Sequence, residues 1–167
     1  NILAPRMYVA HAYLTDTIAQ ISSLFAVPNG VTPQALSRVI MDEIAGMAVS
    51  SENAIEFGNA SMIEAIIRRV GISIGRVLAG SLLTGAATVI ADANRQLGAL
   101  DLTPGFEFSQ QAERIKLVSQ GAIVMALQKA LMGELGIAAV VEANTGEELT
   151  AQILAAVIPP TLLVPEL

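Results

Sequence analysis

Residues 70–91 form an almost unbroken run of apolar and small residues, and Arg76 is the only charged side chain within it. A membrane span needs about 20 predominantly apolar residues, so this run is long enough for one. Residues 117–141 form a second apolar run, but Lys129 and Glu134 interrupt it, and neither run has the aromatic residues expected at a bilayer interface. The sequence therefore favours packed helices, and a membrane role stays open as the alternative.

Small residues recur at helical spacing within the first run. Gly71, Gly75 and Ala79 follow one another every four residues, which would place them on one face of a helix, and Ser81 and Gly85 add a second small pair. Such spacing lets another helix backbone approach closely. It predicts a tight helix crossing, either inside one subunit or between subunits. Gly71, Gly75 and Ala79 are therefore candidate interface residues.

Arg76 lies in this apolar run, and a buried guanidinium must find a carboxylate or carbonyl partner. Glu134 is similarly isolated among apolar residues and is the first candidate, with Asp92 and Glu113 as others. We predict a buried or interfacial ion pair between Arg76 and Glu134 that fixes helix register. The alternative is an arginine side chain that extends to water.

The composition points to a surface that is covered by something other than water. Charged residues make up 14% of the chain, against roughly 25% in a typical soluble domain, and the mean hydropathy is +0.61. Either lipid or other subunits would cover such a surface. The net charge of −6 argues against nucleic acid, whose binding proteins display a basic patch. We expect a homo-oligomer or a subunit of a larger assembly, with a membrane possible but less favoured.

Local signals place most elements in helices. Thr32 followed by Pro33 marks the start of a helix, so helices are expected near residues 6–26 and 33–49. Ser61 and Glu64 form a capping-box pattern, from which a helical region could run to about Gln96, with Gly98 after it. Whether this region breaks near Gly71 is left open.

The C-terminal third continues the helical pattern. A helix is expected from Ser109 to about Gly133 or Gly136, residues 137–143 fit either a short strand or a continuing helix, and Thr145 and Glu148 repeat the capping-box pattern for a helix over 146–157. The apolar tail, residues 159–167, is expected to dock on the body or on a neighbour, and its Leu162, Leu163 and Val164 are further candidate interface residues.

These signals predict an all-α fold: a compact bundle of five or six helices with one or two strongly apolar central helices. The 167 residues are expected to form a single domain, 1–167.

Patterns for catalysis or cofactor binding are missing from the sequence. His11 is the only histidine, cysteine is absent, and no phosphate-binding glycine loop occurs. His11 and Asp16 are five residues apart, which aligns them poorly on a helix, so a locally bonded or exposed His11 is expected. We predict no catalytic, cofactor or metal residues.

The alanine- and leucine-rich helices with few charges are similar in composition to helical assembly domains of fibre proteins, such as spidroins, and to helical viral coat subunits. The chain lacks the abundant serine of the fibre domains and the excess of basic residues of coats that wrap nucleic acid, so no family is assigned.

The leading hypothesis is a non-enzymatic structural subunit that self-associates into an oligomer, shell or filament. A membrane-associated or lipid-binding protein is the alternative, and a small enzyme using scattered carboxylates is a third. The first residue, Asn1, suggests a processed chain or an excised domain, and processing would favour an exported or assembled protein.

Overall fold

The computed structural model describes residues 3–51 and 54–160, and every regular element in these ranges is helical. The elements are α1 (Leu3–Ser23), α2 (Pro33–Ser50), α3 (Ala60–Ser73), α4 (Gly80–Gly98), α5 (Phe106–Leu117), the π-helix η1 (Val118–Ile123), α6 (Val124–Leu131), α7 (Ile137–Ala143) and α8 (Gly146–Ala155). Because α5, η1 and α6 follow without a gap, the described ranges hold seven helices. The all-α prediction is confirmed, and the expected number of five or six is too low.

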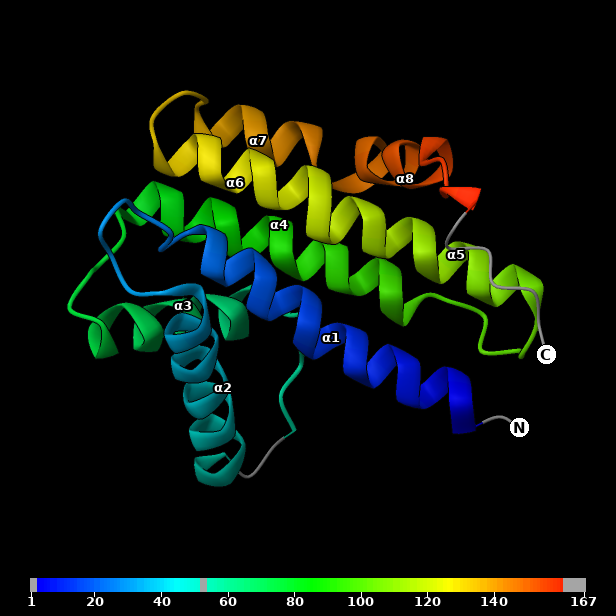
Figure 1. Cartoon of the computed structure of the whole chain (residues 1–167), viewed down its shortest axis with the longest axis horizontal. Helices are drawn as coiled ribbons and strands as arrows, with labels where there is room; N and C mark the ends of the chain where they lie inside the picture. The colour runs from blue at the N-terminus through cyan, green and yellow to red at the C-terminus, as the bar shows by residue number, and fades with distance from the viewer. Residues whose placement is uncertain (1–2, 52–53, 161–167) are drawn as a thin grey trace.

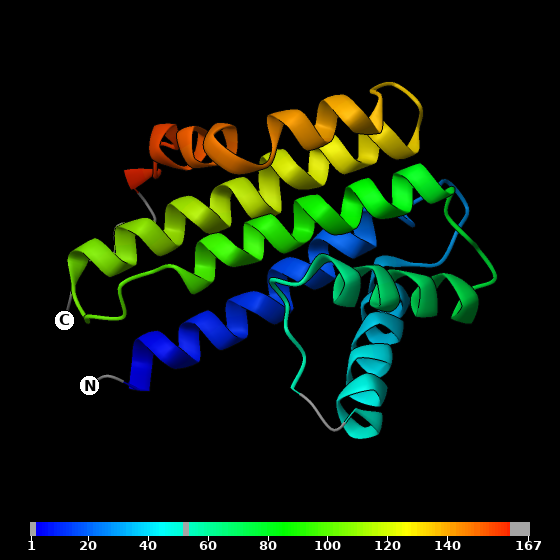
Figure 2. The ribbon, with the colours of Figure 1, turned by 180° about the vertical axis from the view of Figure 1, so that it is seen from behind.

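The helices form an elongated bundle with one protruding arm. Helices α1, α4 and the continuous α5–η1–α6 helix run along the long axis, and α7 and α8 follow one another along the outer side of α6 and α5 (Figure 1). Helix α3 packs against α4, while α2 contacts α1 and α3 and projects away from the long axis, as the view from behind also shows (Figure 2).

Helix α4 lies at the centre of these contacts, because it packs against α1, α3, α5, α6, α7 and α8. Several of its buried positions carry alanine, namely Ala86, Ala87, Ala91 and Ala93. Gly85 faces α7, where a side-chain carbon would overlap Ile137 and come within 3.2 Å of Val141. The close helix crossing expected around Gly85 is therefore present, and it lies inside the chain.

A turn at Gly75 separates α3 from α4, so the helical region between residues 61 and 96, whose continuity near Gly71 the sequence left open, is broken. Gly75 has a φ of +71°, in the left-handed region that glycine adopts readily. Its amide donates to the Ile72 carbonyl at 3.2 Å, and the Arg76 amide donates to the Gly71 carbonyl at 2.7 Å. These two bonds define a Schellman motif, which ends α3.

The same turn corrects the predicted stripe of small residues. Gly71 lies in α3, whereas Gly75 and Ala79 lie in the connection to α4, so the three do not share one helix face. Gly71 instead serves the turn: a side-chain carbon there would lie 2.6 Å from the Arg76 carbonyl oxygen. The every-four spacing thus reflects a helix end and not a continuous packing surface.

The first predicted helix start is confirmed and the second lies two residues earlier. The Thr32 hydroxyl accepts a hydrogen bond from the Ala35 amide at 3.3 Å, with Pro33 at the first helical position of α2. Helix α3, in contrast, is capped by Asn59, whose Oδ1 accepts from the amides of Ser61 and Met62. The predicted Ser61 cap is wrong because the helix begins two residues earlier, where Asn59 accepts from the free amides of the first turn.

The last predicted cap is replaced by a contact from another helix. Thr145 occupies the cap position of α8, but its hydroxyl donates backward to the Val141 carbonyl at 2.7 Å. The Gly146 amide instead donates to Asp92 Oδ2 of α4 at 2.7 Å. A carboxylate at a helix N-terminus is stabilising, so α4 holds the start of α8 in place.

Residues 137–143 form helix α7, which excludes the strand that the sequence left open. A second Schellman motif precedes it: Gly133 has a φ of +74°, and the Glu134 amide donates to the Lys129 carbonyl at 2.9 Å. Helix α7 is thus separate from α6 and folds back along it (Figure 1). Among the helices of residues 3–51 and 54–160, none combines the length and the hydropathy that crossing a membrane requires.

Gly85→Ala is expected to lower stability by about 1–2 kcal/mol, although alanine is the better helix former, because the added methyl group overlaps Ile137. Gly121→Ala in η1 is the matched control, since a side-chain carbon there meets no atom within 4 Å. The control should leave stability unchanged or raise it by up to about 1 kcal/mol. Urea denaturation followed by circular dichroism measures both. A Gly85→Ala protein as stable as the control would contradict the tight α4–α7 contact.

Candidate functional site

Helix α1 buries a row of polar side chains inside the bundle. Asp16, Thr17, Gln20 and Ser23 are all buried, and Asp16, Gln20 and Ser23 recur at the spacing of one helix face. Asn94 of α4 and Ser119 of η1 are the buried polar residues opposite. We call these six residues the polar seam. Buried polar groups are costly unless they are hydrogen-bonded, so their partners decide what the seam does.

Two sets of hydrogen bonds tie α1 to its neighbours. On one side, Asn94 Nδ2 donates to the Thr17 hydroxyl at 2.9 Å and to the Phe57 carbonyl at 3.1 Å. On the other side, Gln20 Nε2 donates to the Ser119 carbonyl at 3.1 Å. These bonds join residues far apart in the sequence. They hold α1 in register between α4 and η1.

The partner of Gln20 lies in the π-helical segment η1. This six-residue segment interrupts the α-helical phase between α5 and α6 at the level of α1's buried polar residues. Such segments are rare and occur frequently at functional sites. Directly after Ser119, the exposed Gln120 donates from Nε2 to Asp16 Oδ1 at 2.6 Å. The irregular turn therefore brings a carbonyl and an amide side chain to α1.

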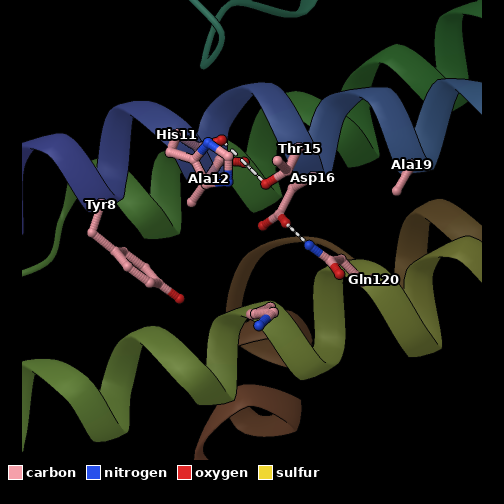
Figure 3. A pocket seen from close by; sticks show the side chains of 8 residues that line it. Tyr8, His11, Ala12, Thr15, Asp16, Ala19 and Gln120 are labelled. Atoms are coloured by element: carbon pink, nitrogen blue, oxygen red, sulfur yellow. Dashed lines mark hydrogen bonds between the residues drawn. The ribbon is translucent and has the colours of Figure 1, made fainter. Parts of the chain in front are cut away.

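A cavity of about 290 Å³ opens between α1 and the α5–η1 helix. Figure 3 shows the side chains that surround it, with Tyr8 directed from α1 toward the opposite helix and Asp16 bonded to Gln120 across the gap. Its lining residues are Tyr8, His11, Ala12, Thr15, Asp16 and Ala19 from α1, with Lys116 and Gln120 opposite. We call this space the Asp16 cavity.

Several buried oxygen atoms beside this cavity and along the seam have no hydrogen-bond partner among the described residues. They are Asp16 Oδ2, Gln20 Oε1, Asn94 Oδ1 and Glu113 Oε2. All four are acceptors, whether carboxylate or amide oxygens. A buried acceptor without a donor costs about 1–3 kcal/mol, and more where it is charged. Among these four residues only Asp16 lines the cavity, so its Oδ2 is the acceptor there that a molecule with a hydrogen-bond donor would satisfy.

Burial raises the pKa of Asp16 to about 6, well above its ordinary value of 3.8. The hydrogen bond from Gln120, the charge of Lys116 and the polar side chain of Ser119 lower the pKa of Asp16, because all three favour the ionised form, while the Glu113 carboxylate adds to the rise. Asp16 is thus mostly ionised at neutral pH and becomes protonated in mildly acidic solution.

Tyr8 supplies a fixed hydroxyl at the same cavity. Burial, together with the nearby Glu113 and Asp16 carboxylates, raises its pKa to about 12, so the phenol stays neutral. Its ring packs edge-on against Phe108 of α5 with centroids 5.7 Å apart, which anchors it between the two helices. Tyr8 therefore offers a hydroxyl and not a negative charge.

The two residues that sequence analysis weighed together, His11 and Asp16, do line one cavity. They differ in setting, since His11 is exposed and Asp16 is buried, and within the described part of the chain no hydrogen bond joins their side chains. The expected exposed histidine is confirmed. The sequence analysis does not predict the buried row on α1: the spacing of Asp16, Gln20 and Ser23 is visible in the sequence, but their burial is not.

Arg76 and Glu134 do not form an ion pair inside the chain. Arg76 is half-buried in the α3–α4 connection, Glu134 is exposed after α6, and neither belongs to any of the four ion pairs of the described residues. Both follow the glycine of a Schellman turn, so they occupy helix ends and not facing helix surfaces. The predicted ion pair between Arg76 and Glu134 is therefore absent within one chain, whereas a pair between two copies stays a prediction.

The other predicted interface residues of the tail, Leu162, Leu163 and Val164, lie outside the described residues.

An apolar groove lies where the predicted interface glycine, Gly71, is buried. A space of about 110 Å³ opens between α3 and the start of α4, and we call it the α3–α4 groove. Ile67, Arg68, Gly71, Ile72, Val77, Leu78 and Leu83 line it. Ile72 and Val77 are 72% and 78% exposed, so large aliphatic side chains border this apolar hollow and face solvent.

Comparison with known proteins gives no further constraint: no family model, curated protein or solved structure matches this chain. Within residues 3–51 and 54–160, no group of three or more acidic or histidine side chains is placed to hold a metal ion. The Asp16 cavity and the α3–α4 groove are therefore interpreted from their own geometry and chemistry.

Asp16→Asn is expected to remove a pH dependence of stability. Because the folded-state pKa lies above the ordinary value, the contribution of this carboxyl is fully present below about pH 3.8 and is lost as the pH rises through about 6. From pH 5 to pH 7.5, the free energy of unfolding of the unmodified protein should fall by about 1 kcal/mol more than that of the variant.

Urea denaturation at the two pH values measures this difference, and Asp42→Asn, at an exposed position of α2, is the matched control. The control should keep the pH dependence of the unmodified protein. If Asp16→Asn also keeps it, Asp16 is not the group that titrates.

Proposed function

We propose that this chain is a non-enzymatic structural subunit that self-associates into an oligomer, shell or filament. The observation that carries the proposal is the α3–α4 groove, where Ile72 and Val77 stand exposed beside an apolar hollow. An exposed apolar surface of this kind typically marks a contact with another molecule. It lies around Gly71, one of the residues that the sequence predicts at an interface.

A second copy of the chain is the proposed occupant of this groove. Only 14% of the residues are charged, so the chain has few charges with which to keep its apolar surfaces apart. Arg68 at the groove is already paired with Glu64 at 2.6 Å, which leaves the neighbourhood with little uncompensated charge. The groove is thus suited to an apolar partner surface.

We also propose that Arg76 of one copy pairs with Glu134 of another. Within the described residues, the Arg76 side chain takes part in no hydrogen bond or ion pair that would satisfy its guanidinium. A two-fold arrangement would form this pair twice, because each copy presents both residues.

We further propose α4 as the strongly apolar central helix that the sequence predicts, because its buried side chains are apolar except for Asn94.

Lipid is the alternative occupant, in which case the chain is membrane-associated or lipid-binding. The same exposed aliphatic side chains would then contact acyl chains. The two possibilities differ in what purification requires. A self-associating subunit forms a discrete multimer without detergent, whereas a lipid-binding protein is recovered with detergent or lipid.

The combined substitution of Ile72→Ser and Val77→Ser is expected to lower the mass of the assembly, because it removes the exposed aliphatic groups of the groove. Val157→Ser is the matched control, since Val157 is 84% exposed but lies after α8, outside the groove. Light scattering after size exclusion, in detergent-free buffer, measures the mass of all three proteins.

A multimer for the unmodified protein and the control, with a smaller species for the double variant, supports the proposal. A 17.4 kDa monomer for the unmodified protein would contradict self-association. Multimers of equal mass in all three would contradict the groove as the contact. Recovery only in detergent would favour the lipid alternative.

A further inference from the structure

The Asp16 cavity holds a negative charge that the chain itself only half satisfies. The Asp16 side chain is fully buried, and its Oδ1 accepts from Gln120 Nε2 at 2.6 Å. Its Oδ2 has no partner among the described residues, although it is equally buried. An ionised carboxylate in such a setting is stabilised by a donor that reaches the second oxygen, and a charged donor does so most strongly.

The charges around the cavity favour a cation. The titratable groups that face Asp16 are Tyr8 and His11 from its own helix and Glu113 and Lys116 from α5, beside the polar side chains of Ser119 and Gln120 from η1. Lys116 Nζ lies 3.8 Å from Glu113 Oε1, so its ammonium is directed to Glu113 and makes no ion pair with Asp16 within the described residues. With Tyr8 neutral, the two carboxylates outnumber the one ammonium, and an entering cation meets an excess of negative charge.

The walls of the cavity indicate an organic cation with a short apolar part. Ala12 and Ala19 lie on either side of Asp16 along α1 and present methyl groups to the space, as Figure 3 shows. A volume of about 290 Å³ is at the low end of ligand pockets. It fits an alkyl chain of a few carbons together with its ammonium group, and it is too small for a drug-sized molecule.

Access to Asp16 depends on one side chain. Gln120 is exposed and lies in the irregular segment η1, so its amide can swing toward solvent without disturbing the core. In the structure it covers one oxygen of Asp16. Outward rotation of Gln120 opens the path to the carboxylate, and its own amide can bond to water when it is displaced.

We propose that the Asp16 cavity binds a small primary alkylammonium compound, whose N–H groups donate to Asp16 Oδ2 and whose alkyl chain lies against Ala12 and Ala19. The Tyr8 hydroxyl bounds the charged end of this site. Binding involves no covalent step. The site uses α1 and α5–η1, so it is separate from the α3–α4 groove and does not rest on self-association.

n-Butylammonium chloride is the probe, and the measurement is a titration followed by the amide and side-chain signals of the ¹⁵N-labelled protein. Saturable shifts are expected around Ala12, Ala19 and the Gln120 side-chain amide. Sodium chloride at equal ionic strength and n-butanol, the neutral molecule of similar size, should not reproduce them. Affinity should fall roughly tenfold from pH 7.5 to pH 5, because Asp16 becomes protonated as the pH falls through about 6.

Asp16→Asn keeps the shape of the side chain and is expected to weaken binding roughly tenfold or more, while Asp42→Asn leaves it unchanged. Ala19→Leu keeps the carboxylate but fills the cavity, so it should also abolish binding. If Asp16→Asn does not fold, Ala19→Leu still tests whether butylammonium binds in this cavity.

The proposal is overturned if butylammonium produces no saturable shifts, in which case the cavity takes up only water. It is also overturned if sodium ion or butanol gives the same shifts, or if Ala19→Leu binds butylammonium as tightly as the unmodified protein. Saturable shifts that depend on both Asp16 and Ala19 support it.

Discussion

The crowding of helices around α4 is the constraint on which the rest of the structure depends. A helix that packs against neighbours on several sides needs small side chains where they approach, and α4 provides alanines and Gly85 there. The position of α7 follows from Gly85, and the start of α8 follows from the bond between Asp92 and the Gly146 amide. One helix therefore positions the C-terminal pair through both packing and capping.

The small residues buried in α4 limit how much apolar burial stabilises its contacts with the surrounding helices. Burying a methyl group contributes less than burying a leucine or isoleucine side chain, so the buried alanines of α4 contribute less apolar burial than its Leu83, Ile90 and Leu97. The polar seam adds directional contacts, because Asn94 bonds to Thr17 and Gln20 bonds to the Ser119 carbonyl. Asp16 is the acidic member of the seam, and burial raises its pKa. One of its oxygens is left unpaired, as are the amide oxygens of Gln20 and Asn94. Such local departures from complete hydrogen bonding are expected at functional sites.

Local chemistry explains which features the sequence predicts. The α2 start at Thr32 and Pro33 could be predicted because cap and helix lie within four residues. The break at Gly75 could not, because glycine is tolerated inside a helix and takes the left-handed conformation only where α3 folds back on α4. The spacing of Asp16, Gln20 and Ser23 is visible in the sequence. Its burial depends on η1, about a hundred residues later in the chain, and nothing local in residues 118–123 announces a π-helix.

Asp16 and Thr17 are neighbours in the chain but face different partners. The first bonds to Gln120 of η1, and the second accepts from Asn94 of α4. A change of charge at Asp16 therefore acts directly on Gln120 of η1, whereas Asn94 of α4 bonds to Thr17. Neither Asp16 nor Thr17 lines the α3–α4 groove. Because α1 is held to α4 by a bond that does not titrate, ligand binding at Asp16 and association through the groove are expected to be energetically independent.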